Sequence, residues 1–224
     1  MININNLCFS YIKGTNLITN INLNIPKGSY VSILGENGSC KSTLVKLILG
    51  LLKPDSGIIN VNSSRTSYVP QRVDSFNSDF PLTVNELLLS HVKALKIKNK
   101  ETINTVLKEI NMYEFKNSLI GNLSGGQQQR IFIARALIGD PDLIILDEPS
   151  TGVDEKNQKE IYPLLKNLNL NRGKTIISVE HNSKIALKYS THILKVENGS
   201  FTLYTTSEFI KQIENNTESI PKII

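Results

Sequence analysis

The chain has 224 residues, of which 40% are hydrophobic and 20% charged, and its formal net charge at pH 7 is +5. This length suits one α/β domain with room for a subdomain, and it is enough to bury a sizeable core. The two cysteines, Cys8 and Cys40, are too few for a disulfide framework and fit a reducing cytosol. No apolar run approaches the roughly 18 residues of a bilayer-spanning helix, and the N-terminus lacks the features of a signal peptide. We therefore expect a cytoplasmic protein that reaches a membrane only by docking onto another component.

A small β region is expected at the N-terminus. Apolar or alternating runs cover residues 2–9, 17–25 and 30–34, and a Pro-Lys-Gly turn at 26–28 separates the last two runs. The run at 30–34 is mostly apolar, which favours a buried strand. The region therefore leads into a central strand.

A glycine-rich loop, G-E-N-G-S-C-K-S-T, follows that strand and precedes a helix expected over residues 42–51. Strand, glycine loop and helix are the arrangement of a phosphate-binding loop, in which backbone N–H groups and the positive end of the helix dipole face a phosphate. In such a loop Lys41 reaches the β- and γ-phosphates, and the Ser42 hydroxyl ligates magnesium. The loop consists of Gly35, Glu36, Asn37, Gly38, Ser39, Cys40, Lys41, Ser42 and Thr43.

Cys40 departs from this pattern, because the residue before the lysine is normally glycine. Glycine lets the backbone approach a phosphate and adopts angles that are costly for other residues. Three outcomes are open: the loop tolerates the cysteine with weaker binding, the cysteine closes the site to nucleotide, or it points away from the phosphates and changes little. We also expect a reactive thiol, since a helix N-terminus and Lys41 both favour the thiolate.

Residues 72–122 have a different character, and we expect a helical subdomain inserted into the α/β core. Thr83 as N-cap with Glu86 three residues later predicts a helix start, and apolar residues keep helical spacing over 87–95. The lysine-rich stretch 93–100 has no interleaved aromatic residues, so binding to nucleic acid is not expected. The other elements expected here are a turn at 53–57, a strand at 57–61, an apolar segment at 68–71, a helix at 101–110 and a short helix at 113–119.

The second half of the chain combines helices with buried strands. Ser124 and the two glycines after it open a helix over 127–137, and they make a second phosphate-binding surface. Residues 142–147 form a strand that ends in carboxylates. Ligands gather at the carboxyl ends of such strands, so we expect Asp147 and Glu148 near the phosphate loop. The remaining expected elements are a helix at 155–168 containing Pro163, a strand at 174–179 ending beside Glu180 and His181, a hairpin of 193–196 and 200–204 around Asn198 and Gly199, and a short helix from 207.

Five motifs occur in a characteristic order: the phosphate loop, L-S-G-G-Q at 123–127, L-I-I-L-D-E-P at 143–149, S-T-G-V-D at 150–154, and His181. The ordered set resembles the ATPase subunit of ABC transporters over nearly the whole chain, from residue 1 to residue 204. The resemblance implies an α/β fold of the P-loop NTPase (ABC ATPase) class, with a mixed central sheet, an N-terminal antiparallel β region and an inserted helical subdomain. It also implies one domain, with a RecA-like core at 1–71 and 139–206, the helical subdomain at 72–138 and a tail at 207–224.

The resemblance assigns the chemistry of ATP hydrolysis to residues that match the family's motifs. Glu148 matches the general base that aligns the attacking water, and His181 matches the switch histidine at the γ-phosphate. Ser42 and Gln71 match the magnesium contacts, and Asp147 matches the aspartate that orders magnesium through its hydration shell. Positioning and neutralisation of charge are what phosphoryl transfer mostly needs, so this set suits the reaction.

Other matching residues hold the nucleotide. Lys41 and the loop backbone match the phosphate cradle, and Tyr11 matches the aromatic residue that stacks on adenine. Asp154 matches an aspartate that crosses between protomers, and the signature residues match those that contact the ATP held by the opposite subunit. The family's active unit is thus a head-to-tail homodimer with ATP sandwiched between its subunits. The signature residues are Ser124, Gly125, Gly126 and Gln127.

The segments Y-V-P-Q-R at 68–72 and F-P-L-T-V at 80–84 resemble the family branch that imports zinc, manganese or iron(II). The expected function is therefore Mg²⁺-dependent ATP hydrolysis that powers divalent metal import through separate membrane permease subunits, together with an extracytoplasmic solute-binding protein. The protein would lie on the inner face of the cell membrane, where Gln71 belongs to the loop that senses the permease. Two alternatives stay open: a nucleotide-binding regulatory module whose hydrolysis is impaired by Cys40, and an ABC ATPase for another solute.

The transported solute is not expected to bind this chain, because the ATPase subunit of the family does not contact it. The sequence accordingly shows no cluster of His, Cys and carboxylate residues suited to a transition metal. His91 and His192 lie outside every motif, and we interpret both as structural residues.

Overall fold

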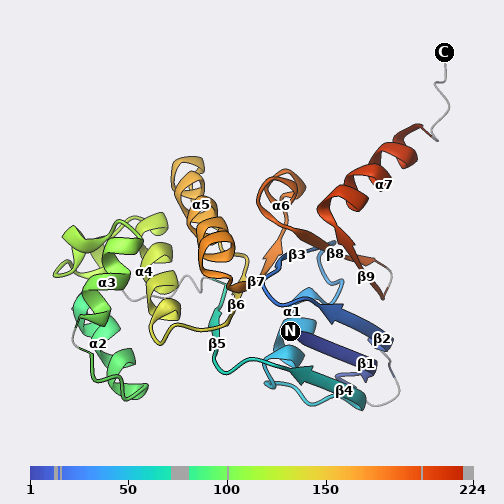
Figure 1. The fold of residues 1–224 in the computed structure, drawn as a ribbon, viewed down its shortest axis with the longest axis horizontal. Helices are drawn as coiled ribbons and strands as arrows, with labels where there is room; N and C mark the ends of the chain where they lie inside the picture. The colour runs from blue at the N-terminus through green and yellow to red at the C-terminus, as the bar shows by residue number, and fades with distance from the viewer. Residues whose placement is uncertain (13–14, 16, 72–80, 100, 198, 219–224) are drawn as a thin grey trace. The chain divides into compact units, whose positions relative to one another are not determined.

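The computed structural model describes residues 1–224 except 13–14, 16, 72–80, 100, 198 and 219–224. The chain divides into two compact units, the first formed by Met1–Asn62 and Thr175–Ile224 and the second by Ser63–Lys174. Figure 1 labels the strands and helices of both units in chain order. Along the sequence, the second unit is therefore an insertion in the first.

An antiparallel sheet of the first unit consists of β1 (Ile2–Phe9), β2 (Ile18–Ile25) and β4 (Ser56–Val61), in the order β2-β1-β4. At the start of β1, Ile2 lies opposite Ile25 of β2 and Val61 of β4. Buried isoleucines alternate with exposed asparagines there, because successive side chains of a strand point to opposite faces. This sheet is the predicted N-terminal antiparallel β region.

A mixed sheet of the same unit carries the glycine loop. Its central strand β3 (Tyr30–Gly35) is parallel to β7 (Thr175–Glu180) on one side and to β8 (His192–Glu197) on the other. The edge strand β9 (Ser200–Thr205) is antiparallel to β8. Both faces of β7 are buried, as the apolar run predicts. The helices of this unit are α1 (Lys41–Ile48), α6 (Ser183–Tyr189) and α7 (Thr206–Glu218).

In its described residues, the second unit combines a parallel strand pair with four helices. β5 (Thr66–Val69) and β6 (Leu143–Asp147) are parallel, with Val69 opposite Leu146. Every residue of β6 is buried, and Asp147 is the last residue of this strand. The helices are α2 (Val84–Ala94), α3 (Thr102–Glu109), α4 (Gly125–Leu137) and α5 (Glu155–Arg172), and 3-10 turns span Tyr113–Phe115 and Ile120–Asn122.

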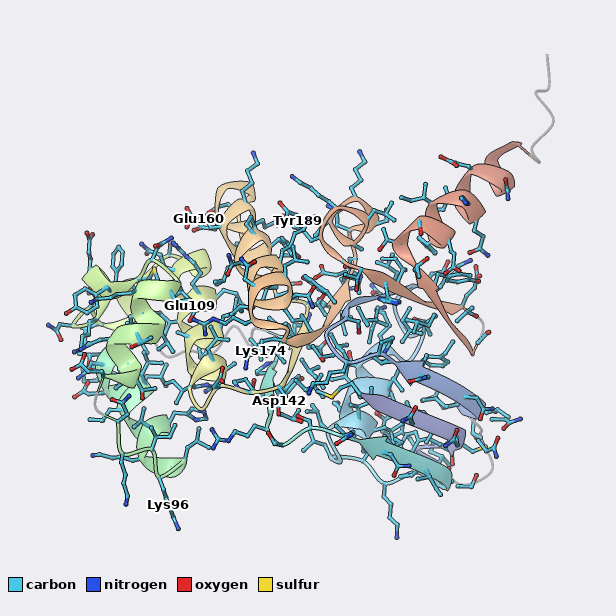
Figure 2. The ribbon with its side chains drawn as sticks, in the orientation of Figure 1. Lys96, Glu109, Asp142, Glu160, Lys174 and Tyr189 are labelled. Atoms are coloured by element: carbon cyan, nitrogen blue, oxygen red, sulfur yellow. The ribbon has the colours of Figure 1, made fainter. Side chains whose placement is uncertain are left out.

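Ion pairs join α5 to two other helices of the second unit, α3 and α4. Arg172 of α5 pairs with Glu109 of α3 at 3.0 Å, and Arg130 of α4 pairs with Glu160 of α5. Figure 2 labels the two glutamates, which lie on the helices that these pairs connect. Two tightly joined helices therefore carry the signature, at the start of α4, and Asp154, at the start of α5.

Local sequence signals located the elements well, with shifted ends. Thr83 caps α2 and Ser124 caps α4, each in a capping box with the residue three positions later. The predicted helix at 113–119 is wrong, because only a 3-10 turn forms at Tyr113–Phe115. α5 continues through Pro163 to Arg172 and ends at Gly173, whose φ of 62° suits a left-handed cap.

The α/β fold class with its mixed sheet and antiparallel N-terminal sheet is confirmed. Residues 72–80, which begin the predicted helical subdomain, lie outside the described residues, as does Asn198 in the predicted hairpin turn. The boundaries of the predicted core, helical subdomain and tail stay a prediction.

Candidate functional site

The loop after β3 depends on two of its glycines. A Cβ added to Gly35 would lie 2.5 Å from the carbonyl oxygen of Val196 and 2.6 Å from Ser39 Oγ, so a side chain does not fit there. Gly38 has a φ of +79°, which residues with a Cβ rarely adopt. The buried Ser39 hydroxyl finds no hydrogen-bond partner among the described residues. The loop thus has the close-packed, glycine-dependent shape of a phosphate cradle. The Ser39 hydroxyl is a hydrogen-bond donor that belongs to this loop.

Lys41 begins α1 and folds back over the loop. Its Nζ donates to the carbonyl oxygens of Gly35 at 2.8 Å and of Glu36 at 2.7 Å, and only 6% of the residue is exposed. Ser42 and Thr43 follow in the first turn of the helix, half-buried and buried respectively. A compact ammonium charge and the positive end of a helix dipole therefore meet at the loop.

Cys40 is the N-cap of α1 and has a left-handed backbone, with φ 74° and ψ 16°. Its Sγ lies 3.7 Å from the carbonyl oxygen of Gly38 and 3.9 Å from that of Leu17. Burial raises the pKa of the Cys40 thiol and outweighs the opposite effect of Lys41. The expected reactive thiolate is therefore wrong, because sequence spacing shows the nearby lysine but not the desolvation.

Tyr11 makes two side-chain contacts, one through its hydroxyl and one through its ring. Its hydroxyl hydrogen-bonds with the Thr43 hydroxyl at 3.2 Å, and its ring meets that of Phe9 edge-on, with centroids 4.9 Å apart and planes at 85°. Yet 60% of the tyrosine is exposed. An anchored aromatic ring with open surface is suited to stacking on a flat base.

Gln71 and Glu148 are in direct contact in the second unit. The Nε2 of Gln71 donates to Glu148 Oε2 at 2.6 Å, and the Thr151 hydroxyl donates to the same oxygen at 2.9 Å. Glu148 also has a φ of 50°, an uncommon conformation for a residue that is neither glycine nor asparagine. Such backbones persist where the surroundings impose them, and they concentrate at functional sites.

Asp147 precedes this glutamate and is 5% exposed. The Tyr68 hydroxyl donates to Asp147 Oδ2 at 3.4 Å. Burial and the neighbouring Asp147 raise the pKa of Tyr68 to about 12, so the phenol stays protonated and remains a donor near neutral pH. Sequence reasoning missed both Tyr68 and Thr151, although Tyr68 lies three residues before Gln71 and Thr151 three residues after Glu148.

The signature lies at the N-terminus of α4. The Ser124 hydroxyl accepts from the Gln127 N–H, and the Gln127 side chain accepts from the Ser124 N–H at 2.8 Å. A Cβ on Gly126 would lie 2.2 Å from Asn157 of α5, so glycine allows the two helix starts to meet. Asp154 caps α5 by accepting from the Asn157 N–H at 2.9 Å. Gly125, the half-buried first residue of α4, completes the helix start together with these residues.

The predicted site residues are divided between the two units. His181 follows β7 directly and is exposed, whereas the preceding Glu180 is 2% exposed. The first unit holds Tyr11, the loop 35–43 and His181, and the second holds Gln71, Asp147, Glu148, Asp154 and the signature 124–127.

The residues present fit a magnesium nucleotide. Hydroxyl, carboxylate and amide oxygens, which Mg²⁺ prefers, come from Ser42, Asp147 and Gln71. Within the described part of the chain, no group of three or more His, Cys, Asp or Glu residues could hold a metal ion by itself.

A glycine-rich loop that contains a buried lysine, and a buried strand that is followed by a glutamate with a left-handed backbone, are features of an ATP-binding cassette. The chain belongs to the ABC transporter family, whose sequence model matches residues 18–151. It is thus an ATPase that binds ATP and hydrolyses it to ADP and phosphate.

Similar proteins within this family include ATP-binding proteins of metal transport systems and a cassette of known structure. A protein of Treponema pallidum named "Probable metal transport system ATP-binding protein" is 46% identical over 92% of this chain and 87% of its own length. The zinc uptake system ATP-binding protein ZurA of Listeria monocytogenes is 40% identical over 88% of this chain and 82% of its own. The dimeric structure of the cassette MJ0796 in a post-hydrolysis state, bound to ADP and Pi, is 29% identical. It has a TM-score of 0.75 and covers 92% of this chain and 99% of that one.

In the part of the chain that the structure describes, no helix is both long and apolar enough to cross a membrane.

Proposed function

We propose that this chain is the ATP-hydrolysing subunit of an ABC transporter that imports a divalent metal ion of the zinc or manganese type. The observation that carries the proposal is the 40% identity to a zinc uptake ATP-binding protein over most of both chains. The match to a metal transport ATP-binding protein at 46% points to the same solute class. The imported ion is cargo and is not a ligand of this chain.

Within the hydrolytic site, Glu148 is the general base that aligns and deprotonates the attacking water. The hydrogen bonds from Gln71 and Thr151 support this role, because they hold the carboxylate in one orientation. A base must lie within hydrogen-bond reach of the proton that it abstracts, so the fixed orientation matters more than the intrinsic basicity. Exposed His181 supplies a further donor toward the γ-phosphate.

The glycine-rich loop 35–43, which includes Lys41, binds the phosphates of ATP. To bind ATP, the lysine exchanges its two carbonyl acceptors for the β- and γ-phosphate oxygens. Ser42, Gln71 and Asp147 would hold Mg²⁺, which would supply positive charge to offset the charge on the phosphates. Tyr11 supports the adenine ring through stacking.

The proposed function also includes a homodimer and membrane partners. The signature helix and Asp154 form the surface that meets the ATP of a second copy in a head-to-tail homodimer, and the dimeric cassette MJ0796 supports this arrangement. The chain binds integral permease subunits on the cytoplasmic side of the membrane, and the complete system includes a solute-binding protein. Gln71 suits a link to the permease, since it touches the catalytic Glu148 and belongs to the loop between β5 and α2.

Cys40 does not favour the alternative of a regulatory module without hydrolysis. Its sulfur contacts carbonyl oxygens, whereas phosphates are bound by the N–H groups of such loops.

The test is co-expression of the chain with candidate permease subunits, followed by ATP-dependent uptake of several divalent metals. We expect uptake of zinc or manganese that requires an intact Glu148. Uptake of a different solute class, with no response to divalent metals, would refute the proposed cargo while leaving the ATPase assignment in place.

A further inference from the structure

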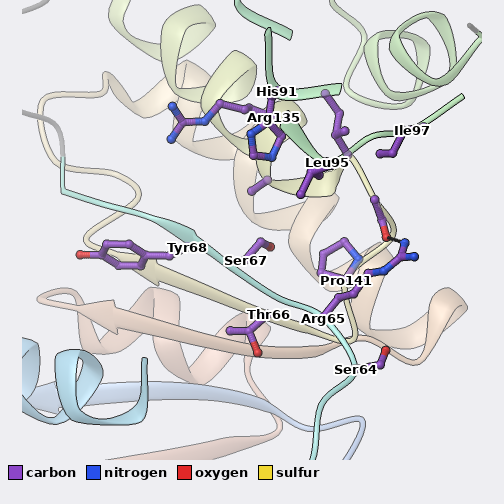
Figure 3. A pocket seen from close by; sticks show the side chains of 13 residues that line it. Ser64, Arg65, Thr66, Ser67, Tyr68, His91, Leu95, Ile97, Arg135 and Pro141 are labelled. Carbon is purple, nitrogen blue, oxygen red and sulfur yellow. Dashed lines mark hydrogen bonds between the residues drawn. The ribbon is translucent and has the colours of Figure 1, made fainter. Parts of the chain in front are cut away.

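A cavity of about 690 Å³ opens in the second unit among β5, α2 and α4 (Figure 3). Its volume lies within the range of about 300–1,000 Å³ that is usual for small-molecule sites. One part of the wall is apolar and includes Leu95, Ile97 and Pro141. None of these residues has a role in nucleotide binding, so the cavity calls for an explanation of its own.

Two arginines, Arg65 and Arg135, belong to the wall of the cavity. Arg135 lies 5.4 Å from the centre of the Phe132 ring, and Arg65 donates to the carbonyl oxygen of Gly139. Neither arginine has an ion-pair partner among the described residues. Burial lowers the pKa of Arg135, but a guanidinium remains charged in proteins. A partly buried cation without a counter-ion is costly, and an anion in the cavity would offset that cost.

Two further polar residues, Ser67 and His91, line the same cavity. The Ser67 hydroxyl is buried and has no hydrogen-bond partner among the described residues. The imidazole of His91 points from α2 toward β5 (Figure 3). Burial and the charge of Arg135 lower the pKa of His91, so the ring is mostly neutral near pH 7 and can donate or accept. The polar groups of the cavity thus match a ligand that carries negative charge and accepts hydrogen bonds.

We propose that this cavity is a binding site for a small organic anion, a carboxylate or phosphate carried on an apolar body. The anionic group lies at Arg135, and the apolar body packs against Leu95 and Ile97. The size and the mixed apolar and cationic lining favour a small molecule over a protein segment, which would need a longer groove.

Occupancy would matter because β5 connects this cavity to the hydrolytic residues of the same unit. Ser67 and Tyr68 line the cavity, and the Tyr68 hydroxyl donates to Asp147. Gln71, two residues beyond the end of β5, donates to Glu148. A ligand against this strand therefore contacts the element that positions two catalytic groups.

The experiment compares octanoate with octanamide, its uncharged counterpart of nearly equal size, by calorimetric titration of the purified full chain without nucleotide. We expect octanoate to bind more tightly by about tenfold or more, the usual value of a charge-assisted hydrogen bond. Arg135→Gln should remove this preference. Lys93→Gln, which removes an exposed charge of α2 outside the cavity, should keep it.

Leu95→Ala is a second variant, chosen because its side chain is 47% exposed and the substitution should not unfold the protein. It should weaken octanoate and octanamide equally, since it trims only the apolar wall. The proposal is overturned if the two ligands bind equally, or if the preference survives in Arg135→Gln. It is also overturned if octanoate fails to bind while a longer acidic helical peptide binds, because the occupant would then be a protein segment.

Discussion

The left-handed backbone of Cys40 allows a quantitative test of the phosphate loop. At φ 74°, a residue with a Cβ costs about 1–2 kcal/mol relative to an unstrained conformation. Glycine avoids this cost but loses about 0.5–1 kcal/mol more conformational entropy on folding. Cys40→Gly should therefore raise the free energy of unfolding by about 0.5–1 kcal/mol. For a chain of this size, that corresponds to an increase in Tm of about 1–4 °C.

Thermal and urea unfolding of the purified chain measure this effect, and Cys40→Ala is the matched control. Alanine keeps the Cβ and removes only the sulfur, whose contacts are weak at 3.7 and 3.9 Å, so it should give no gain. Because the sulfur lies against carbonyl oxygens, Cys40→Gly should change the Kd of ATP by less than about threefold. An equal gain in both variants would refute the backbone argument. Tenfold or tighter ATP binding by Cys40→Gly would show instead that the cysteine obstructs the phosphates.

Four further predictions concern the site. Glu148→Gln should keep ATP binding, lower turnover by about 10²–10⁴-fold and let an ATP-bound dimer accumulate; turnover at the parental rate would show that Glu148 is not the base. Gln71→Ala should reduce metal uptake in the permease complex more than it reduces ATP affinity, and unchanged uptake would exclude a coupling role. Gly126→Ala should destabilise the fold by about 1–3 kcal/mol, because its Cβ would lie 2.2 Å from an α5 side chain; an unchanged urea midpoint would contradict this packing. Iodoacetamide near pH 7.5 should label Cys8 faster than Cys40, since hydrogen bonds lower the pKa of the first thiol and burial raises that of the second. Faster labelling of Cys40 in the Cys8→Ser variant than of Cys8 in Cys40→Ser would contradict that order.

Local patterns in the sequence determined the order of the elements and the class of protein. The capping boxes of α2 and α4 involve residues only three positions apart, so their letters carry the whole interaction. The buried strands β6 and β7 are also predicted locally, because a short continuous run of apolar residues is typical of a buried strand. The ordered motifs then indicated an ABC ATPase, and the family match confirmed it.

Tertiary structure alone decided how two of the predicted catalytic side chains meet. Gln71 and Glu148 are 77 positions apart, and no spacing rule predicts their 2.6 Å hydrogen bond. The raised pKa of Cys40 and the left-handed backbone of Glu148 depend on burial and packing that a sequence does not state. His91, which belongs to no motif, gains its place in a cationic cavity only when α2 and α4 pack beside β5. Desolvation and side-chain direction exist only in the packed chain. The residue type alone therefore does not determine the pKa of a side chain or the groups that it contacts.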